Sequence, residues 1–191
     1  MIRTMTRAIA STVATRRPLT CAILTALAAT APTGVLNAQD AMESCALAAP
    51  GNLVVYGDGM DPVAIPAGRL GELPRASFDG TFHDGRPARF EGVELREILT
   101  LVGVTEELHG PDMRRFVVVE ATDGYAAVFA LAELDPTFRQ DVPMLADRQD
   151  GQPIREGFGP LQVIVPGDAR QGRWVRQVEC LRLERFTGTR P

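Results

Sequence analysis

The chain lacks the residue combinations that most hydrolases and zinc enzymes need. The chain has 191 residues. Residues 39–191 include only two serines, Ser44 and Ser77, and two histidines, His83 and His109. No G-x-S-x-G motif surrounds either serine, so a Ser–His–acid hydrolase has no support. His83 is followed directly by Asp84, but no second histidine lies at helical spacing, so a zinc site is not indicated. This pair is typical of a polar turn.

Long hydrophobic runs are absent after the N-terminal region. The first 38 residues contain four arginines, no acid and a mostly apolar or small run from Leu19 to Leu36, which is typical of an export signal. We expect cleavage after Ala38, with Ala41 as the alternative. The mature domain, residues 39–191, is then periplasmic or secreted and has no membrane span. Residues 15–20 resemble a twin-arginine export motif, and an ordinary signal with two basic residues is the other interpretation.

Lysine is absent from the whole chain, and the domain without its signal is acidic. Residues 39–191 carry 16 arginines against 24 acidic residues, a net charge of about −8. Such a domain is not expected to bind nucleic acid. The missing lysine is more typical of codon bias than of function, although the forked guanidinium also suits phosphate and carboxylate ligands.

Cysteine is scarce, and its positions indicate a disulfide. Cys21 leaves with the signal, so the mature domain keeps Cys45 and Cys180. In an oxidising compartment this even pair predicts a bridge between the mature N-terminus and a late strand. Two separate buried thiols are the alternative. A reactive thiol is not indicated, because the sequence offers no activating base nearby.

Turn signals and short apolar runs predict one strand-rich α+β domain. Asp-Gly occurs five times, and this dipeptide tolerates the positive φ angles of tight hairpins. The runs 116–120 and 125–129 flank one such turn, and consecutive valines in the first run predict a strand buried on both faces. Helical spacing is firm only over 95–102, ending at Gly103. We also expect a short turn from 131 to 135, strands at 53–56, around 90–92, at 144–146, 161–165 and 175–183, and a frayed tail at 186–191.

Arginines cluster near the C-terminus around the one tryptophan of the chain. Arg170, Arg173 and Arg176 recur every third residue beside Trp174, and Arg155 precedes the apolar strand before them. Such a loop can direct several guanidinium groups at one oxyanion. The same arginines can instead form surface ion pairs with the surplus carboxylates, and the tryptophan can be core. The residues alone leave both interpretations open.

Four segments, in order, carry a resemblance to a known family. They read FEGVELREILTLVGV, ATDGYAAVFALAELDP, VPMLADRQDGQPI and GPLQVIVPGDARQGRWVRQVECLRL. Together, over about Leu73 to Leu183, they resemble the molybdopterin-binding domain of sulfite oxidase-type oxidoreductases, above all its small exported single-domain members. The resemblance implies a strand-rich α+β fold with a pterin site where loops converge. It also implies, for the full enzymes, a cysteine thiolate on molybdenum and basic residues on the pterin phosphate.

Carried over residue by residue, the resemblance implies an altered site. The equivalent of the molybdenum-ligating cysteine falls near Asp84, and a carboxylate does not reproduce a soft thiolate. A Pro-Leu-Arg strand of many cofactor-binding members reads Pro160-Leu161-Gln162 here, and Glu156 stands where a histidine is expected. Arg173 and Arg176 remain where the pterin phosphate would be held, beside a carboxylate that repels it.

We therefore expect a binding or accessory module of this fold rather than a self-sufficient oxidase. Its pocket is expected to hold a small anionic or pterin ligand and to be lined by His83, Asp84, Arg173, Trp174 and Arg176. The alternative is an active molybdenum-cofactor oxidoreductase, in which Asp84 or a solvent oxygen replaces the missing ligand and a separate periplasmic redox partner takes the electrons. A structural or interaction domain without a small ligand is the third hypothesis.

Overall fold

The structure is a computed structural model that describes Cys45 and residues 49–82, 84–104 and 108–188. The predicted export signal and His83 lie outside the described residues. No helix among the residues that the structure describes is long and apolar enough to cross a membrane.

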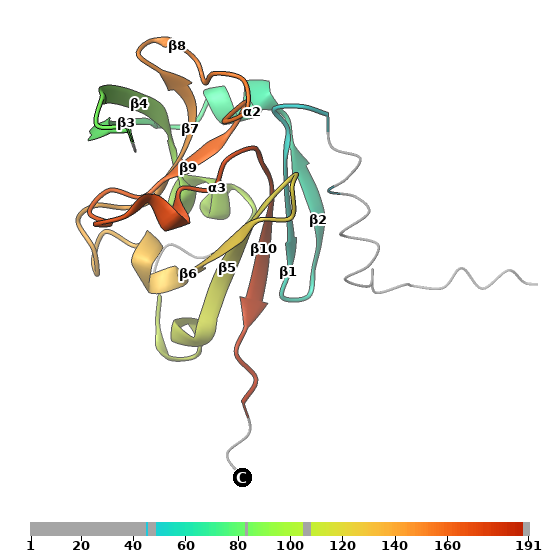
Figure 1. Cartoon of the computed structure of the whole chain (residues 1–191). Coiled ribbons are helices and arrows are strands. Elements are labelled where there is room, and N and C mark those ends of the chain that lie inside the picture. The colour runs from blue at the N-terminus through green and yellow to red at the C-terminus, as the bar shows by residue number, and fades with distance from the viewer. Residues whose placement is uncertain (1–44, 46–48, 83, 105–107, 189–191) are drawn as a thin grey trace, which may run out of the picture. The chain divides into compact units, whose positions relative to one another are not determined.

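The described residues form ten strands, arranged in two sheets. Figure 1 shows their arrangement. The first sheet has the order β2-β1-β10-β5-β6, with β1 and β10 parallel and the other pairs antiparallel. Its strands are β1 (Leu53–Gly57), β2 (Met60–Ile65), β5 (Arg115–Ala121), β6 (Ala126–Ala130) and β10 (Val178–Arg185). The second sheet has the order β3-β4-β7-β8, and β9 also pairs with β7. Its strands are β3 (Arg75–Thr81), β4 (Pro87–Glu94), β7 (Met144–Gln149), β8 (Gln152–Pro153) and β9 (Gln162–Ile164).

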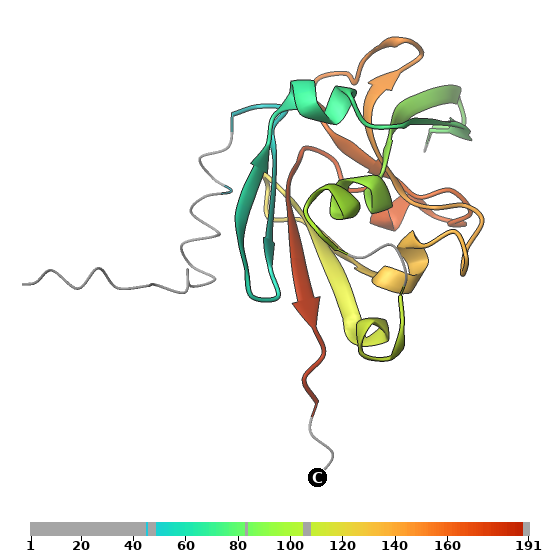
Figure 2. The same ribbon diagram turned by 180° about the vertical axis from the view of Figure 1, so that it is seen from behind.

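Short helices connect the strands (Figure 2). They are the α-helices α2 (Ala67–Gly71) and α3 (Leu95–Leu101) and the 3-10 helices η1 (Gly110–Arg114), η2 (Leu131–Leu134) and η3 (Gln171–Arg173). Leu95, Ile98 and Leu99 of α3 are buried, and Gly103 follows with φ +85°, a conformation that glycine adopts without strain. The predicted helix and its glycine end are therefore confirmed.

Alternation along the first sheet separates two apolar layers. On β1, Leu53 and Val55 point into the main core that both sheets share, whereas Val54 and Tyr56 lie in a small cluster on the opposite face. Cys180 of β10 belongs to this second cluster. It is disulfide-bonded to Cys45, as the sequence predicts, so the bridge fastens the segment before β1 to the outer face of the sheet.

The predicted strands are found, with differences at their ends. The hairpin of β5 and β6 is confirmed, and Val117, Val118 and Val119 are all buried. The strand expected from Val175 begins only at Val178, because η3 and the loop after it precede β10. The sequence analysis missed β2, β3 and α2, and Asp79-Gly80, expected at a turn, lies inside β3.

Candidate functional site

A pocket of about 370 Å³ opens where loops from both sheets meet. This volume lies in the range of small-molecule sites. The β5–β6 turn, the loop before β9, β9 itself and the segment from η3 to β10 supply its lining: Asp123, Tyr125, Phe158, Gln162, Gln171, Gly172, Trp174 and Arg176.

Two hydrogen bonds fasten η3 to its neighbours and so shape the pocket wall. The hydroxyl of Tyr125, from the β5–β6 turn, donates to the carbonyl oxygen of Gly172. The side-chain Nε2 of Gln171 donates to the carbonyl oxygen of Thr81 at the end of β3. Both sheets therefore bind the same short helix, which fixes the positions of the pocket walls relative to each other.

Trp174 is both a core residue and a wall of the pocket. Its ring packs edge-on against Phe78 and Phe90, with centroids 6.3 and 5.5 Å away. Its Nε1 donates to the carbonyl oxygen of Val165 at 3.1 Å, which satisfies the buried indole N–H. The two interpretations left open for this tryptophan are thus compatible: most of the ring is core, and one part faces the pocket.

Gln162 lines the pocket and has a buried, unsatisfied acceptor. The residue is only 4% exposed, and its Oε1 has no hydrogen-bond partner among the described residues. A buried acceptor without a donor costs about 1–3 kcal/mol of stability. This is the glutamine that stands in place of the arginine expected from the family pattern, so the substitution exchanges a cation for a neutral group with an open acceptor.

Two exposed arginines contact the ring of Phe158, which lines the pocket. The Cζ atoms of Arg155 and Arg176 lie 4.0 and 4.6 Å from the ring centre of Phe158. Arg155 also lies 4.8 Å from the ring centre of Phe82. Within the part of the chain that the structure describes, neither arginine has an ion pair with a carboxylate. Phe158 is therefore in contact with two cations that have no carboxylate partner among the described residues.

Arg173, by contrast, is fully engaged inside the protein. Its Nε and Nη2 donate to Asp168 at 2.9 and 2.8 Å, and its Nη1 donates to Glu133 at 2.9 Å. The Asp168 hydrogen bonds raise the pKa of the guanidinium above its ordinary value. The ring of Phe129 covers it at 4.9 Å. Arg173 is not among the residues that line the pocket, so its predicted contact with a ligand stays a prediction.

Asp84 lies on an exposed polar turn. Its carboxylate accepts hydrogen bonds from the backbone N–H of Arg86 at 3.1 Å and from Nε of the same arginine at 2.9 Å. Gly85 has φ +81°, as a tight turn requires. Asp84 does not line the pocket either, and its role and that of His83 stay predictions. Among the described residues, no group of three or more His, Cys, Asp or Glu side chains is placed to hold a metal ion.

Sequence reasoning found two of the pocket residues as ligand candidates, Trp174 and Arg176. It recognised Gln162 as an altered position and the segment 123–124 as a turn, but it did not connect them with a site. Phe158 was missed, because a lone phenylalanine in a glycine-rich loop gives no sequence signal for a site.

Comparison with known proteins identifies the family. The domain family described as the oxidoreductase molybdopterin binding domain matches residues 84–188, more than half of the chain. The chain belongs to this family. The search of curated proteins found no match.

The fold is similar to that of a solved structure. The sulfane dehydrogenase SoxCD from Paracoccus pantotrophus is similar with a TM-score of 0.53 and 19% sequence identity, over 69% of this chain and 37% of that chain. At this identity the likeness shows the fold alone. The predicted strand-rich α+β fold of the molybdopterin-binding domain is thereby confirmed, and the chain spans well under half of the SoxCD chain that it matches.

The residues present do not fit a molybdenum ion as the family pattern holds it. The sequence has no cysteine from 46 to 179, and Cys45 and Cys180 are joined to each other in the cluster outside the main core. A disulfide sulfur is not a thiolate ligand. The pocket, in contrast, is lined by three aromatic residues, Tyr125, Phe158 and Trp174, and by one cation, Arg176. Such a lining suits a planar organic group or a planar anion.

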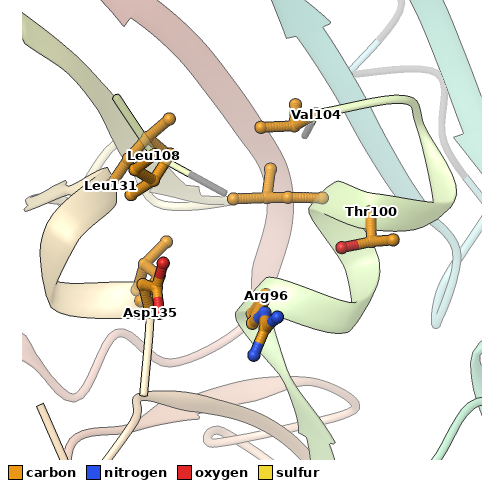
Figure 3. Close-up of a pocket in the computed structure, with 8 residues that line it drawn as sticks. Arg96, Thr100, Val104, Leu108, Leu131 and Asp135 are labelled. Atoms are coloured by element: carbon orange, nitrogen blue, oxygen red, sulfur yellow. The ribbon is translucent and has the colours of Figure 1, made fainter. Parts of the chain in front are cut away.

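A second hollow lies between α3 and η2 (Figure 3). Its volume is about 20 Å³, room for little more than one water molecule. Leucine and valine side chains form most of its wall, and Arg96 and Asp135 stand at its edge. A hydrogen bond from the backbone N–H of Thr137 lowers the pKa of Asp135. This hollow is too small for a substrate, so it is a packing feature.

Proposed function

We propose that this molybdopterin-binding-family domain is an exported binding or accessory module that holds a small planar anion in the Trp174 pocket and does not act alone as an oxidase. One observation carries the proposal: the domain has a pocket lined by aromatic residues and Arg176, while Cys45 and Cys180, the two cysteines that would remain after removal of the expected signal, form a disulfide. Without a thiolate, the family's metal chemistry has no anchor here.

The first experiment is elemental analysis for molybdenum, with pterin fluorescence after oxidation. The protein is the full chain, exported by a host that makes the cofactor. We expect less than about a tenth of an equivalent of molybdenum, because no soft ligand is available to retain it. A stoichiometric amount of molybdenum would overturn the proposal. A family member with the thiolate, exported by the same host, shows that the cofactor was supplied.

An active molybdenum oxidoreductase is the second candidate, and family membership favours it. In this candidate Asp84, near the position of the missing cysteine, provides an oxygen ligand, and a separate redox protein takes the electrons. Stoichiometric molybdenum that is lost in Asp84→Ala would support it. Retention of the metal in that variant would assign the ligand elsewhere.

A further inference from the structure

Strand β6 forms one edge of the first sheet, and its sequence has none of the features that usually prevent an edge strand from pairing further. It reads Ala-Ala-Val-Phe-Ala from Ala126 to Ala130, without a charged residue or a proline. The opposite edge, β2, contains the exposed Asp61 and also Pro62, which has no N–H to donate. Of these two edges, β6 is therefore the one that suits pairing with a further strand.

The hydrogen bonds of the β5–β6 hairpin show which backbone groups of β6 point outward. The N–H of Ala121 donates to the carbonyl oxygen of Tyr125 at 2.9 Å. Bonded pairs alternate along an antiparallel ladder, so every second residue of β6 turns its N–H and C=O away from β5. In the observed register these residues are Ala126, Val128 and Ala130. Oε2 of Glu133 accepts the outward N–H of Ala130 at 3.0 Å.

Two outward donors of β6, the N–H groups of Ala126 and Val128, have no partner among the described residues. The side chain of Val128 adds apolar surface beside them, because it is 54% exposed. It lies opposite Val118 of β5, on the face of the sheet that also carries the disulfide cluster. A strand that paired with β6 would therefore satisfy backbone donors and bury an exposed valine together.

A second copy of the chain, paired through its own β6, fits this edge. A two-fold axis at Val128 places the valine opposite its counterpart, and each Ala126 opposite Ala130 of the second copy. The N–H of Val128 then meets the C=O of the other Val128, and the N–H of Ala126 meets the C=O of Ala130. Both outward donors of each copy are satisfied. The N–H that Glu133 already bonds is not needed.

This pairing closes on itself. It uses the unprotected edge of each copy and leaves the two β2 strands, with Asp61 and Pro62, at the outer ends of the joined sheet. An isologous pair of this kind ends at the dimer, whereas pairing of β6 with β2 would continue into a filament. The sequence of β2 disfavours that second arrangement.

The local charges are compatible with two copies. Residues 126–130 have no ionisable side chain, so no like charges oppose each other along the strand. The register brings Asp123 of the hairpin turn toward Glu133 of the second copy, and Glu133 is already paired with Arg139 and Arg173. The net negative charge of residues 39–191 repels only at longer range, where salt screens it.

We propose that the chain forms a two-fold dimer in which the β6 strands pair antiparallel about Val128, so that the two five-stranded first sheets become one continuous sheet. The inference is independent of the proposed function, because Val128 is not part of the pocket lining. A pairing of five-residue strands is small beside a standard protein interface. We therefore expect a dissociation constant of about 100 µM.

The first test is sedimentation of the exported chain from about 10 to 500 µM, at about 0.3 M salt to screen repulsion between the acidic domains. We expect the dimer fraction to rise from about 15% to about 70% over this range. Val128→Lys sets two like charges opposite each other on the axis, and is expected to weaken the dimer at least about tenfold.

Val63→Lys is the matched control for the charge. Val63 is 38% exposed and lies on β2, the other edge of the same sheet, so the variant adds the same charge away from the pairing. Its dissociation constant is expected to stay within about twofold of the wild type. Thermal melting of both lysine variants shows that these exposed substitutions have left the fold intact.

Val128→Cys tests the position of the axis. Residues that form a bonded antiparallel pair have Cα atoms about 5.5 Å apart, a distance that a disulfide spans. Under mild oxidation we expect Val128→Cys to form a covalent dimer about tenfold faster than Val63→Cys, because its thiols are held together. Non-reducing gels measure both rates. Cys45 and Cys180 are at most 5% exposed, so their bridge is shielded from the new thiol.

Three results would each overturn the inference. The first is a wild-type chain that stays monomeric through the whole concentration range. The second is a dimer that persists unchanged in Val128→Lys, since it would use another surface. The third is equal rates of covalent dimer formation in the two cysteine variants, since the axis would then not pass through β6.

Discussion

At the scale of the residue, the fold changes the protonation of Tyr56. It is 2% exposed, and its hydroxyl donates to Oε2 of Glu120 at 2.8 Å. Oε1 of the same glutamate accepts Nε of Arg182 at 2.9 Å, so one carboxylate links three adjacent strands. Burial, followed by the Glu120 hydrogen bond, raises the pKa of Tyr56 from 10.0 to about 12.

This shift predicts a loss of stability in alkali. The folded-state pKa lies above that of the unfolded chain, so the contribution of Tyr56 is complete below pH 10 and is lost as the pH rises toward 12. Tyr125→Phe leaves Tyr56 as the one tyrosine of the chain. In that variant we expect tyrosinate absorbance to titrate near pH 12 when folded and about two units lower in denaturant. A folded midpoint near 10 would contradict this prediction.

The residue scale also shows where sequence reasoning stops. Arg173 and Arg176 are three positions apart in one loop and were equivalent as candidates. They differ in their partners, which come from other elements. Arg173 bonds to Glu133 of η2, and Arg176 contacts Phe158 in the loop before β9. Local spacing identifies an arginine cluster. It does not show which arginine pairs with a carboxylate, because that depends on tertiary packing.

At the scale of the element, β4 and β7 approach each other closely at Gly92. A Cβ on Gly92 would lie 2.0 Å from the carbonyl oxygen of Leu145 and 2.5 Å from Cα of Ala146. The register of the two strands also shifts at this point. Both contacts are with backbone, so no side-chain rotation can relieve them. Glycine is therefore required for β4 to pair with β7.

Gly92→Ala is accordingly expected to lower the free energy of unfolding by about 3 kcal/mol, at the upper end of the usual cost of overpacking. Gly68→Ala, in α2, is the matched control, since nothing lies within 4 Å of its Cβ position. It is expected to be neutral or slightly stabilising. Guanidinium unfolding curves measure both. Equal unfolding midpoints for the two variants would contradict this prediction, because they would mean that the backbone of β7 shifts to make room for the added methyl group.

Elements with strong periodicity were predicted, and those without it were missed. The helix over 95–101 and the β5–β6 hairpin combine apolar spacing with a glycine signal, and both formed. Strand β2 contains Pro62 and exposed residues at the sheet edge, where pairing on one side suffices. The sequence feature that indicates β2 is the Asp58-Gly59 turn before it, rather than the composition of the strand itself.

At the scale of the whole molecule, the disulfide links distant parts of the chain. Cys45 and Cys180 are separated by 135 residues, and the bridge packs with Val54 and Tyr56. Closing so long a loop removes much of the freedom of the unfolded chain. The pairing was predictable because removal of the expected signal, with Cys21, would leave an even number of cysteines. The face of the sheet on which it lies was not, because strand alternation fixes the face only once the register is known.

Cys45→Ala/Cys180→Ala is expected to lower the free energy of unfolding by about 3–5 kcal/mol. Unfolding curves with and without dithiothreitol test this. The reductant should shift the midpoint of the wild-type chain and leave that of the variant unchanged. A variant as stable as the oxidised wild type would mean that packing alone holds the segment before β1 in place.

The position of β10 sets an order of assembly. It is the last strand of the described chain, yet it lies between β1 and β5 in the middle of its sheet. The β1–β2 and β5–β6 hairpins therefore share no sheet until residues 178–185 have been synthesised. Contacts so distant in sequence form slowly. The first sheet can therefore be completed only near the end of synthesis, and we expect its two hairpins to lack their shared hydrogen-bonded neighbour until then.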